Sequence, residues 1–122
     1  MPGVEPPPFS ELLGGQEWFD DAAAVIFLVA CFERTAWKYT HPTGYRVVLM
    51  EAGHIGQNLL LAAADAGLAA APTAAIHDGV VEGLLGLEPP LRSAVYAVAL
   101  GPPGPGRSVA DFHAVVPNPV FE

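Results

Sequence analysis

The order of the predicted elements places this chain in the α+β class. Two apolar strand patterns, 23–32 and 93–100, lie on either side of one long helical pattern, 44–66. Short helical patterns and a proline-containing strand occupy the remaining intervals. The resulting order is helix, strand, long helix, strand, short helix, strand and tail, which mixes both element types in one chain. A length of 122 residues fits a single domain.

The elements predicted before the long helix are a short helix and one strand. Residues 1–8 are rich in proline and are expected to be extended. Ser10 is placed to N-cap a short helix that ends at Gly14–Gly15. Ala23–Phe32 is continuously apolar and contains β-branched and aromatic residues. This composition predicts a strand that is buried on both faces.

The long helix is predicted from apolar residues that recur at i, i+3 and i+4 spacing. Thr43 is placed to cap its start and Gly67 its end. The helix also carries four polar residues, some of which share one face because they are three or four positions apart. They are expected to form hydrogen bonds to the backbone and to a partner subunit. These residues are Glu51, His54, Gln57 and Asn58.

A strand and a short helix are predicted after the long helix. Leu68–Ile76 has the composition of a strand followed by a loop. Pro72 excludes a central position in the sheet for this strand, because proline has no N–H to donate to a neighbour. Gly79–Leu85 is predicted to form a short helix with Asp78 at its start and Gly86 at its end.

The composition excludes several classes of partner. The chain has a formal net charge of −8 and only 5 Lys and Arg residues, so it has no basic face for nucleic acid or for an anionic membrane. Its hydrophobic content of 52% is high for a small monomer and suggests burial against another subunit. The start of the sequence lacks a signal-peptide pattern, and the apolar run Ala22–Phe32 is too short to span a bilayer. A cytoplasmic protein is therefore expected.

The sequence does not predict a metal site. The four-residue stretch Glu51–His54 differs from HExxH, and the other histidines, His41, His77 and His113, have no paired spacing. Cys31 lies in an apolar run, where a buried structural thiol is expected rather than a reactive one.

An ordered series of short motifs resembles a known family. The series is KY, GYR, EAGHIGQNLLLAAADAGL, PTAAIHD, VEGLLGL and YAVALG, and it extends over most of the chain. It is similar to the C-terminal half of nitroreductase-like flavin-dependent oxidoreductases, in particular the SagB-type, or azoline dehydrogenase, branch. The resemblance implies a mainly antiparallel sheet flanked by helices, with a long central helix and FMN at a dimer interface. On this basis residues 1–21 form a proline-rich lead with short helices, 22–101 the half-domain and 102–122 a Pro/Gly-rich tail.

The resemblance also implies a reaction and two residues that take part in it. The flavin accepts a hydride at N5, and an azoline ring of a modified peptide is oxidised to the azole. Lys38 and Tyr39 match a Lys-Tyr pair that removes the proton in this branch. A lysine works as a base near neutral pH only when burial or neighbouring charge lowers its pKa. The alternative is an exposed lysine beside a packed tyrosine near a helix start.

Cofactor-binding positions follow from the same resemblance. Pro72, Thr73, Ala74 and Ala75 match a segment that runs along the flavin edge and donates backbone N–H groups. An ordinary transition from strand to loop is the alternative. Arg107 matches a basic residue that contacts the FMN phosphate. It ends the stretch GPPGPGR, whose prolines lack the N–H donors of a phosphate-binding loop.

One part of the family pattern is missing from this sequence. Family members have an N-terminal half with an arginine-rich segment that holds FMN, whereas this chain has no arginine before Arg34. A homodimer, or a heteromer with a chain that supplies the missing half, is therefore expected. Two alternatives stay open. One is a non-catalytic partner subunit or degenerate half-domain without flavin, and the other is a small protein that binds an apolar ligand at the same interface.

Overall fold

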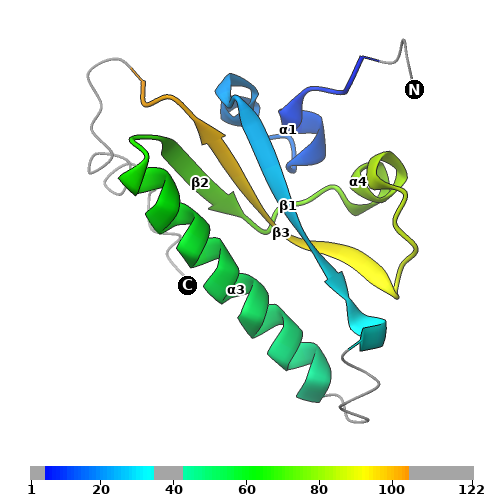
Figure 1. Cartoon of the computed structure of the whole chain (residues 1–122). Helices are drawn as coiled ribbons and strands as arrows, with labels where there is room; N and C mark the ends of the chain where they lie inside the picture. Colours follow the sequence, from blue (N-terminus) through cyan, green and yellow to red (C-terminus); the bar gives the residue numbers. More distant parts are fainter. Residues whose placement is uncertain (1–4, 35–42, 105–122) are drawn as a thin grey trace, which may run out of the picture.

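The computed structural model describes residues 5–34 and 43–104. Its centre is a three-stranded antiparallel sheet with the strand order β1-β3-β2 (Figure 1). The strands are β1 (Ala24–Cys31), β2 (Ala69–Thr73) and β3 (Arg92–Gly101). β3 pairs with β1 over 92–100, with an irregularity at Val95, but it pairs with β2 only over 97–101. The α+β class and the antiparallel sheet are as predicted.

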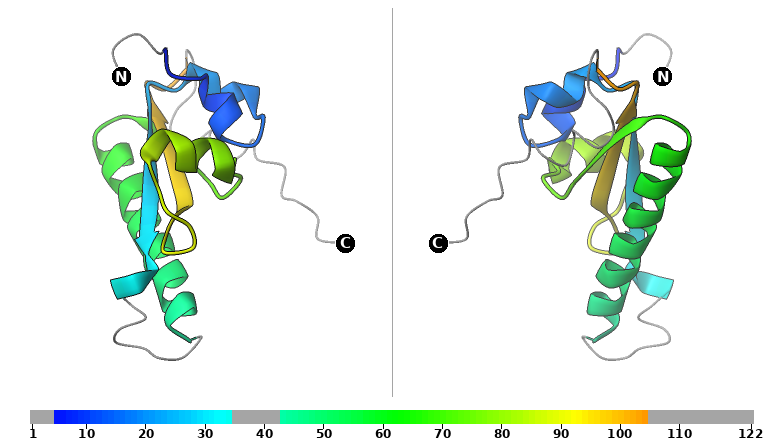
Figure 2. Two further views of the ribbon diagram at one scale, coloured as in Figure 1. Left: turned by 90° about the vertical axis from the view of Figure 1, so that its right-hand side faces the viewer. Right: turned by 90° about the vertical axis from the view of Figure 1, so that its left-hand side faces the viewer.

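Helices cover both faces of the sheet. The long helix α3 (Thr43–Asp65) lies across one face. The short elements α1 (Phe9–Leu12), η1 (Glu17–Asp21) and α4 (Asp78–Leu85) lie on the opposite face (Figure 2). The chain therefore forms three layers, with the sheet in the middle.

The main core lies between the sheet and the short helices. Gly14 and Gly15 have φ values of 66° and 75°, so the chain reverses after α1 in a conformation that suits glycine. The backbone N–H of His77 donates to the carbonyl of Leu12 at 2.8 Å and joins α1 to the start of α4. The buried members of this core are Leu12, Leu13, Phe19, Ala71, Val81, Ala94, Ala97 and Ala99.

The contact between α3 and the sheet is made by small residues. Gly44, Ala52, Gly56 and Ala63 are the buried positions of the helix, which lets its backbone lie close to the strands. The larger apolar side chains of α3 are left mostly exposed. By length and composition alone α3 could cross a membrane, and core helices of soluble proteins share this property. Only 11% of the most apolar 18-residue stretch of α3 is buried in the described fold.

Several sequence predictions need correction. β1 is not buried on both faces: Ala30 is its one buried residue and most of the others are half-buried. The reason is that β1 is an edge strand of the described sheet and α3 lies mainly against β3 and β2. Ser10 does not cap α1. Pro8 holds that position, and the backbone N–H of Ser10 donates to Asp20 Oδ1 at 2.7 Å. Asp78 is the first residue of α4 instead of its cap, which is His77.

The predicted helix ends and the edge position of β2 are confirmed. Gly67 and Gly86 adopt the left-handed conformation, with φ values of 73° and 63°, after α3 and α4 respectively. Pro72 pairs with Val98 from an edge strand, where its missing N–H costs no hydrogen bond within the sheet.

Candidate functional site

The predicted flavin-edge segment forms a tight turn at the end of β2. The backbone N–H of Ala75 donates to Thr73 Oγ1 at 3.0 Å. The N–H of Ile76 donates to the carbonyl of Ala74, also at 3.0 Å. A threonine hydroxyl that accepts from the N–H two residues later stabilises a turn and ends the strand. The chain therefore leaves the sheet after Thr73 and runs to α4.

This turn presents bare backbone at the surface. Pro72, Ala74 and Ala75 are exposed, and the two alanines have no side chain beyond Cβ. The N–H of Ala74 donates to no group in the described part of the chain. On the inner side a Cβ added to Gly14 would lie 3.2 Å from Ala75 Cβ and 3.3 Å from its carbonyl oxygen. The loop after α1 therefore supports the turn from below.

These residues fit one part of FMN and not another. The small side chains and the available Ala74 N–H suit the edge of a flat ring whose nitrogen and oxygen atoms accept hydrogen bonds. A phosphate needs basic side chains or several converging N–H groups. The basic residues of the described part, Arg34, Arg46 and Arg92, lie at the end of β1, in the first turn of α3 and at the start of β3. None of these positions adjoins 72–75, so the phosphate would have to be bound by other residues.

A pocket of about 340 Å³ lies beside the half of β3 that β2 does not cover. Phe32 and Tyr45 stack at one side, with ring centroids 4.9 Å apart and an interplanar angle of 17°. Asp78 and Glu82 of α4 form the other side. The residues that line the pocket are Phe32, Tyr45, Leu49, Asp78, Glu82, Pro90, Ser93, Ala94 and Val95. The sequence did not reveal this pocket, because it arises where one strand is shorter than its neighbour.

Three of the predicted site residues, Lys38, Tyr39 and Arg107, lie outside the described residues. Their roles stay predictions. The pocket-lining Phe32 and Tyr45 precede and follow Lys38 and Tyr39 in the sequence, and their rings are stacked.

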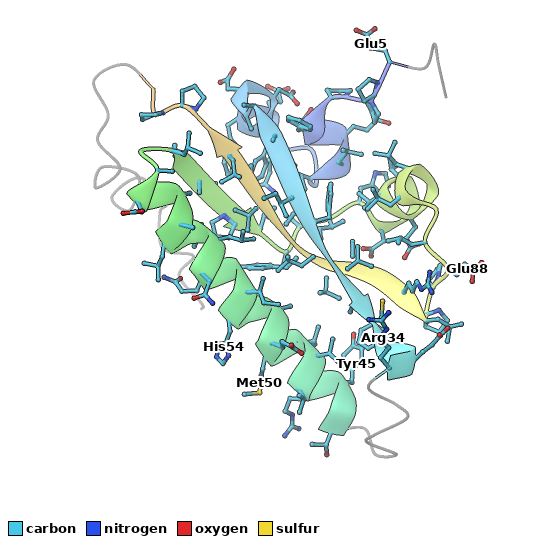
Figure 3. All side chains as sticks on the ribbon, viewed as in Figure 1. Glu5, Arg34, Tyr45, Met50, His54 and Glu88 are labelled. Atoms are coloured by element: carbon cyan, nitrogen blue, oxygen red, sulfur yellow. The ribbon has the colours of Figure 1, made fainter. Side chains whose placement is uncertain are left out.

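The four polar residues predicted to form a bonded seam on α3 are all exposed. His54 points away from the sheet in Figure 3. Their side chains have no hydrogen-bond partner within the residues that the structure describes. Among those residues there is also no cluster of His, Cys, Asp and Glu that could hold a metal ion.

The outer surface of α3 is unusually apolar for a helix facing solvent. Met50 is 57% exposed and Leu61 60% exposed, and Met50 points away from the sheet (Figure 3). Val47 and Ile55 are other exposed apolar residues of the helix, and Tyr45 and Leu49 are exposed where they line the pocket. A patch of this kind is typical of a surface that contacts another molecule.

The sequence matches the family model described as the nitroreductase family over residues 5–102. The chain belongs to the nitroreductase family. This confirms the family expected from the ordered motifs, and the α+β nitroreductase-like fold agrees with it.

The chain is similar to the trifolitoxin-processing protein TfxB of Rhizobium leguminosarum bv. trifolii. The two are 39% identical over 72 residues, which is 58% of this chain and 19% of TfxB. The chain thus spans about a fifth of this relative. The match supports the SagB-type branch within the family.

Two solved structures share the nitroreductase fold. A protein of Anabaena variabilis assigned as a nitroreductase superposes with a TM-score of 0.69 at 22% identity, over 89% of this chain and 21% of that one. A chain of the E. coli microcin synthetase McbBCD complex, determined with truncated pro-MccB17 bound, gives a TM-score of 0.60 at 23% identity. That match covers 71% of this chain and 36% of the synthetase chain.

Proposed function

We propose that this chain is part of an FMN-dependent oxidoreductase that acts in the maturation of a peptide natural product, with azoline-to-azole oxidation as the reaction. The observation that carries the proposal is the exposed turn at 72–75, where the Ala74 N–H is available and the side chains are small. Membership of the nitroreductase family and the similarity to a toxin-processing protein support it.

The chemistry divides between the cofactor and the chain. When bound, the flavin supplies a two-electron acceptor that takes a hydride at N5. The Ala74 N–H would donate to the ring edge, and the Thr73–Ala75 hydrogen bond would hold the turn in place. Lys38 would accept the substrate proton, and Tyr39 would orient the substrate ring. Loss of one hydride and one proton leaves the aromatic azole, so electrons and protons balance.

A second subunit is part of the proposal. The exposed apolar side chains of α3 would be covered by another copy of the chain, or by a chain that supplies the FMN phosphate site. The absence of arginine near 72–75 among the described residues favours such an added chain. Arg107 is the candidate from this chain for the phosphate contact. A cytoplasmic site of action fits this proposal.

A non-catalytic role is the second candidate. A partner subunit or degenerate half-domain would keep α3 and its apolar surface and would not bind flavin. The observation that favours it is the same lack of a basic side chain beside the turn among the described residues.

The visible spectrum of the purified full chain, with and without added FMN, separates the two candidates. Bound flavin absorbs near ~450 nm because of its own chromophore, and its fluorescence changes in a protein environment. Saturable binding of FMN supports the oxidoreductase. A chain that shows no flavin absorbance after free FMN has been removed, at every FMN concentration tried, supports the non-catalytic subunit.

A further inference from the structure

We infer that the uncovered half of β3 binds an extended peptide carrying a basic residue, which pairs with the strand edge at 92–95 and places its cation beside Asp78 and Glu82. In the described residues β2 stops at Thr73, opposite Ala97. On that side no strand of the described ranges 5–34 and 43–104 pairs with 92–96 of β3, and the pocket of about 340 Å³ lies there. An unpaired edge is a template for an added strand.

The hydrogen bonds to β1 show which backbone groups face the open side. The carbonyls of Leu91 and Leu100 both accept from β1-side N–H groups, those of Phe32 and Ala23 at 3.0 and 2.8 Å. In a regular strand, successive carbonyls point to alternate sides, so two carbonyls an odd number of positions apart point in opposite directions. Leu91 and Leu100 are an odd number of positions apart, yet both of their carbonyls point toward β1.

A β-bulge resolves this mismatch. The pairing shifts between Leu28 and Val29, so that Val29 faces Ala94 and Leu28 faces Tyr96, with Val95 as the extra residue. Arg92 and Ala94 consequently turn their N–H and C=O groups toward the open side. The N–H of Val95 points toward β1 instead, because it belongs to the same trans peptide unit as the Ala94 C=O. These groups form a short ladder for a strand of a few residues.

The walls of the pocket determine the kind of peptide that fits. Tyr45 and Leu49 of α3 offer apolar surface on one side. Asp78 and Glu82 of α4 line the other side, and neither has a basic partner among the described residues. Their spacing of i and i+4 puts both carboxylates on one face of the helix. A lysine or arginine between small apolar residues complements this surface in both charge and polarity.

That the natural ligand is the peptide substrate rests on the proposed function. The binding of a peptide at the edge of β3 does not require flavin. The test is therefore made on the full chain without FMN. The probe is an N-terminally fluorescein-labelled pentapeptide amide, Thr-Val-Lys-Val-Thr, and the measurement is fluorescence anisotropy. Failure of this test leaves the flavin proposal intact, and absence of flavin binding leaves this site intact.

Two further peptides have the same sequence with methylated backbone amides. The first is N-methylated at the two valines, and the second is N-methylated at the other three residues. A strand bound at an edge uses the amides of alternate residues only. One methylation pattern should therefore abolish binding, and the other should preserve it. Equal binding of both methylated peptides would overturn the inference, as would absence of saturable binding by the unmethylated probe.

Charge variants test the side of the pocket formed by α4. Asp78→Asn and Glu82→Gln should each weaken binding of the lysine peptide by about 2- to 5-fold, the range for partly exposed ion pairs. Glu88→Gln, an exposed carboxylate that does not line the pocket, is the matched control and should change nothing. A glutamate peptide that binds as well as the lysine peptide would contradict the inference. So would concentration-dependent self-association blocked by the lysine peptide, which would assign the edge to a second copy of the chain.

Discussion

Gly56 of α3 lies directly against the ring of Tyr96 on β3. A Cβ added at Gly56 would meet the Tyr96 Cε1 atom, and it would lie 2.8 Å from Cδ1. No helical residue with a side chain fits there unless the ring or the helix moves. The contact between Gly56 and the Tyr96 ring limits how closely α3 can pack on the sheet at this position.

Gly56→Ala should destabilise the chain by about 1–3 kcal/mol, the cost of overpacking a filled contact. The control is Gly53→Ala in the same helix, where a Cβ would meet nothing within 4 Å. Removing that exposed glycine should stabilise the chain by up to about 1 kcal/mol through helix propensity. Urea denaturation measures both free energies of unfolding. Equal shifts in the same direction would show that Tyr96 yields at no cost.

Leu61→Glu should weaken self-association of the chain by about tenfold or more, because it places a charge in the apolar surface of α3. Leu84→Glu makes the same substitution at an exposed leucine of α4, on the opposite side of the sheet, and serves as the control. Sedimentation velocity over a range of concentrations measures the change. If the unsubstituted chain remains monomeric at high concentration, a second copy of the chain is excluded as the partner of α3. The partner would then be a different chain.

Ala74→Pro should weaken FMN binding by about fivefold, since it removes one N–H donor to the ring edge and a buried hydrogen bond contributes on the order of 1 kcal/mol. The substitution suits its position, because residue 73 is already in an extended strand. Ala70→Ser, a partly buried position of β2 away from the turn, is the control. Flavin fluorescence titration measures both. Unchanged FMN affinity in Ala74→Pro would exclude the N–H of this residue as a flavin contact.

Lys38→Gln should reduce the rate of azoline oxidation far more than it changes the KM of the modified peptide. A base acts only in the transition state, so its loss lowers kcat without weakening substrate binding. The loss expected for a general base is about 10²–10⁴-fold. Arg46→Gln, an exposed cation of α3, is the control for the loss of a positive charge. A rise in KM at constant kcat would instead assign Lys38 to substrate binding.

The elements of this fold were predictable where the pattern is local. The periodicity of 44–66, the glycines at 67 and 86 and the proline at 72 each act through nearby backbone, and the structure places α3, α4 and β2 accordingly. The start of α1 was not predictable, because the helix begins one residue before Ser10 and the Ser10 N–H donates to Asp20, ten positions away in the sequence. The burial of β1 depends on which strands α3 covers, and sequence periodicity does not contain that information.

The site was only partly predictable. The residues at 72–75 were found through the family resemblance, since four small residues at a strand end have no pattern of their own. The pocket beside β3 depends on the different lengths of β2 and β3 and on a bulge at Val95, and both are properties of pairing between distant segments. Asp78 was predicted as the cap of a short helix and Glu82 as part of that helix. Their position at the side of the pocket became visible only in the fold.

The contact between Gly14 and Ala75 has a practical consequence for protein production. The turn at 72–75 rests on the α1 loop, and Leu12, Leu13 and Phe19 fill the space beneath the sheet. An expression clone trimmed to begin at residue 22 would uncover Val81 and Ala97 and remove the platform under the turn. Such a shortened polypeptide is expected to precipitate, so the early segment must be retained in any crystallisation or labelling work.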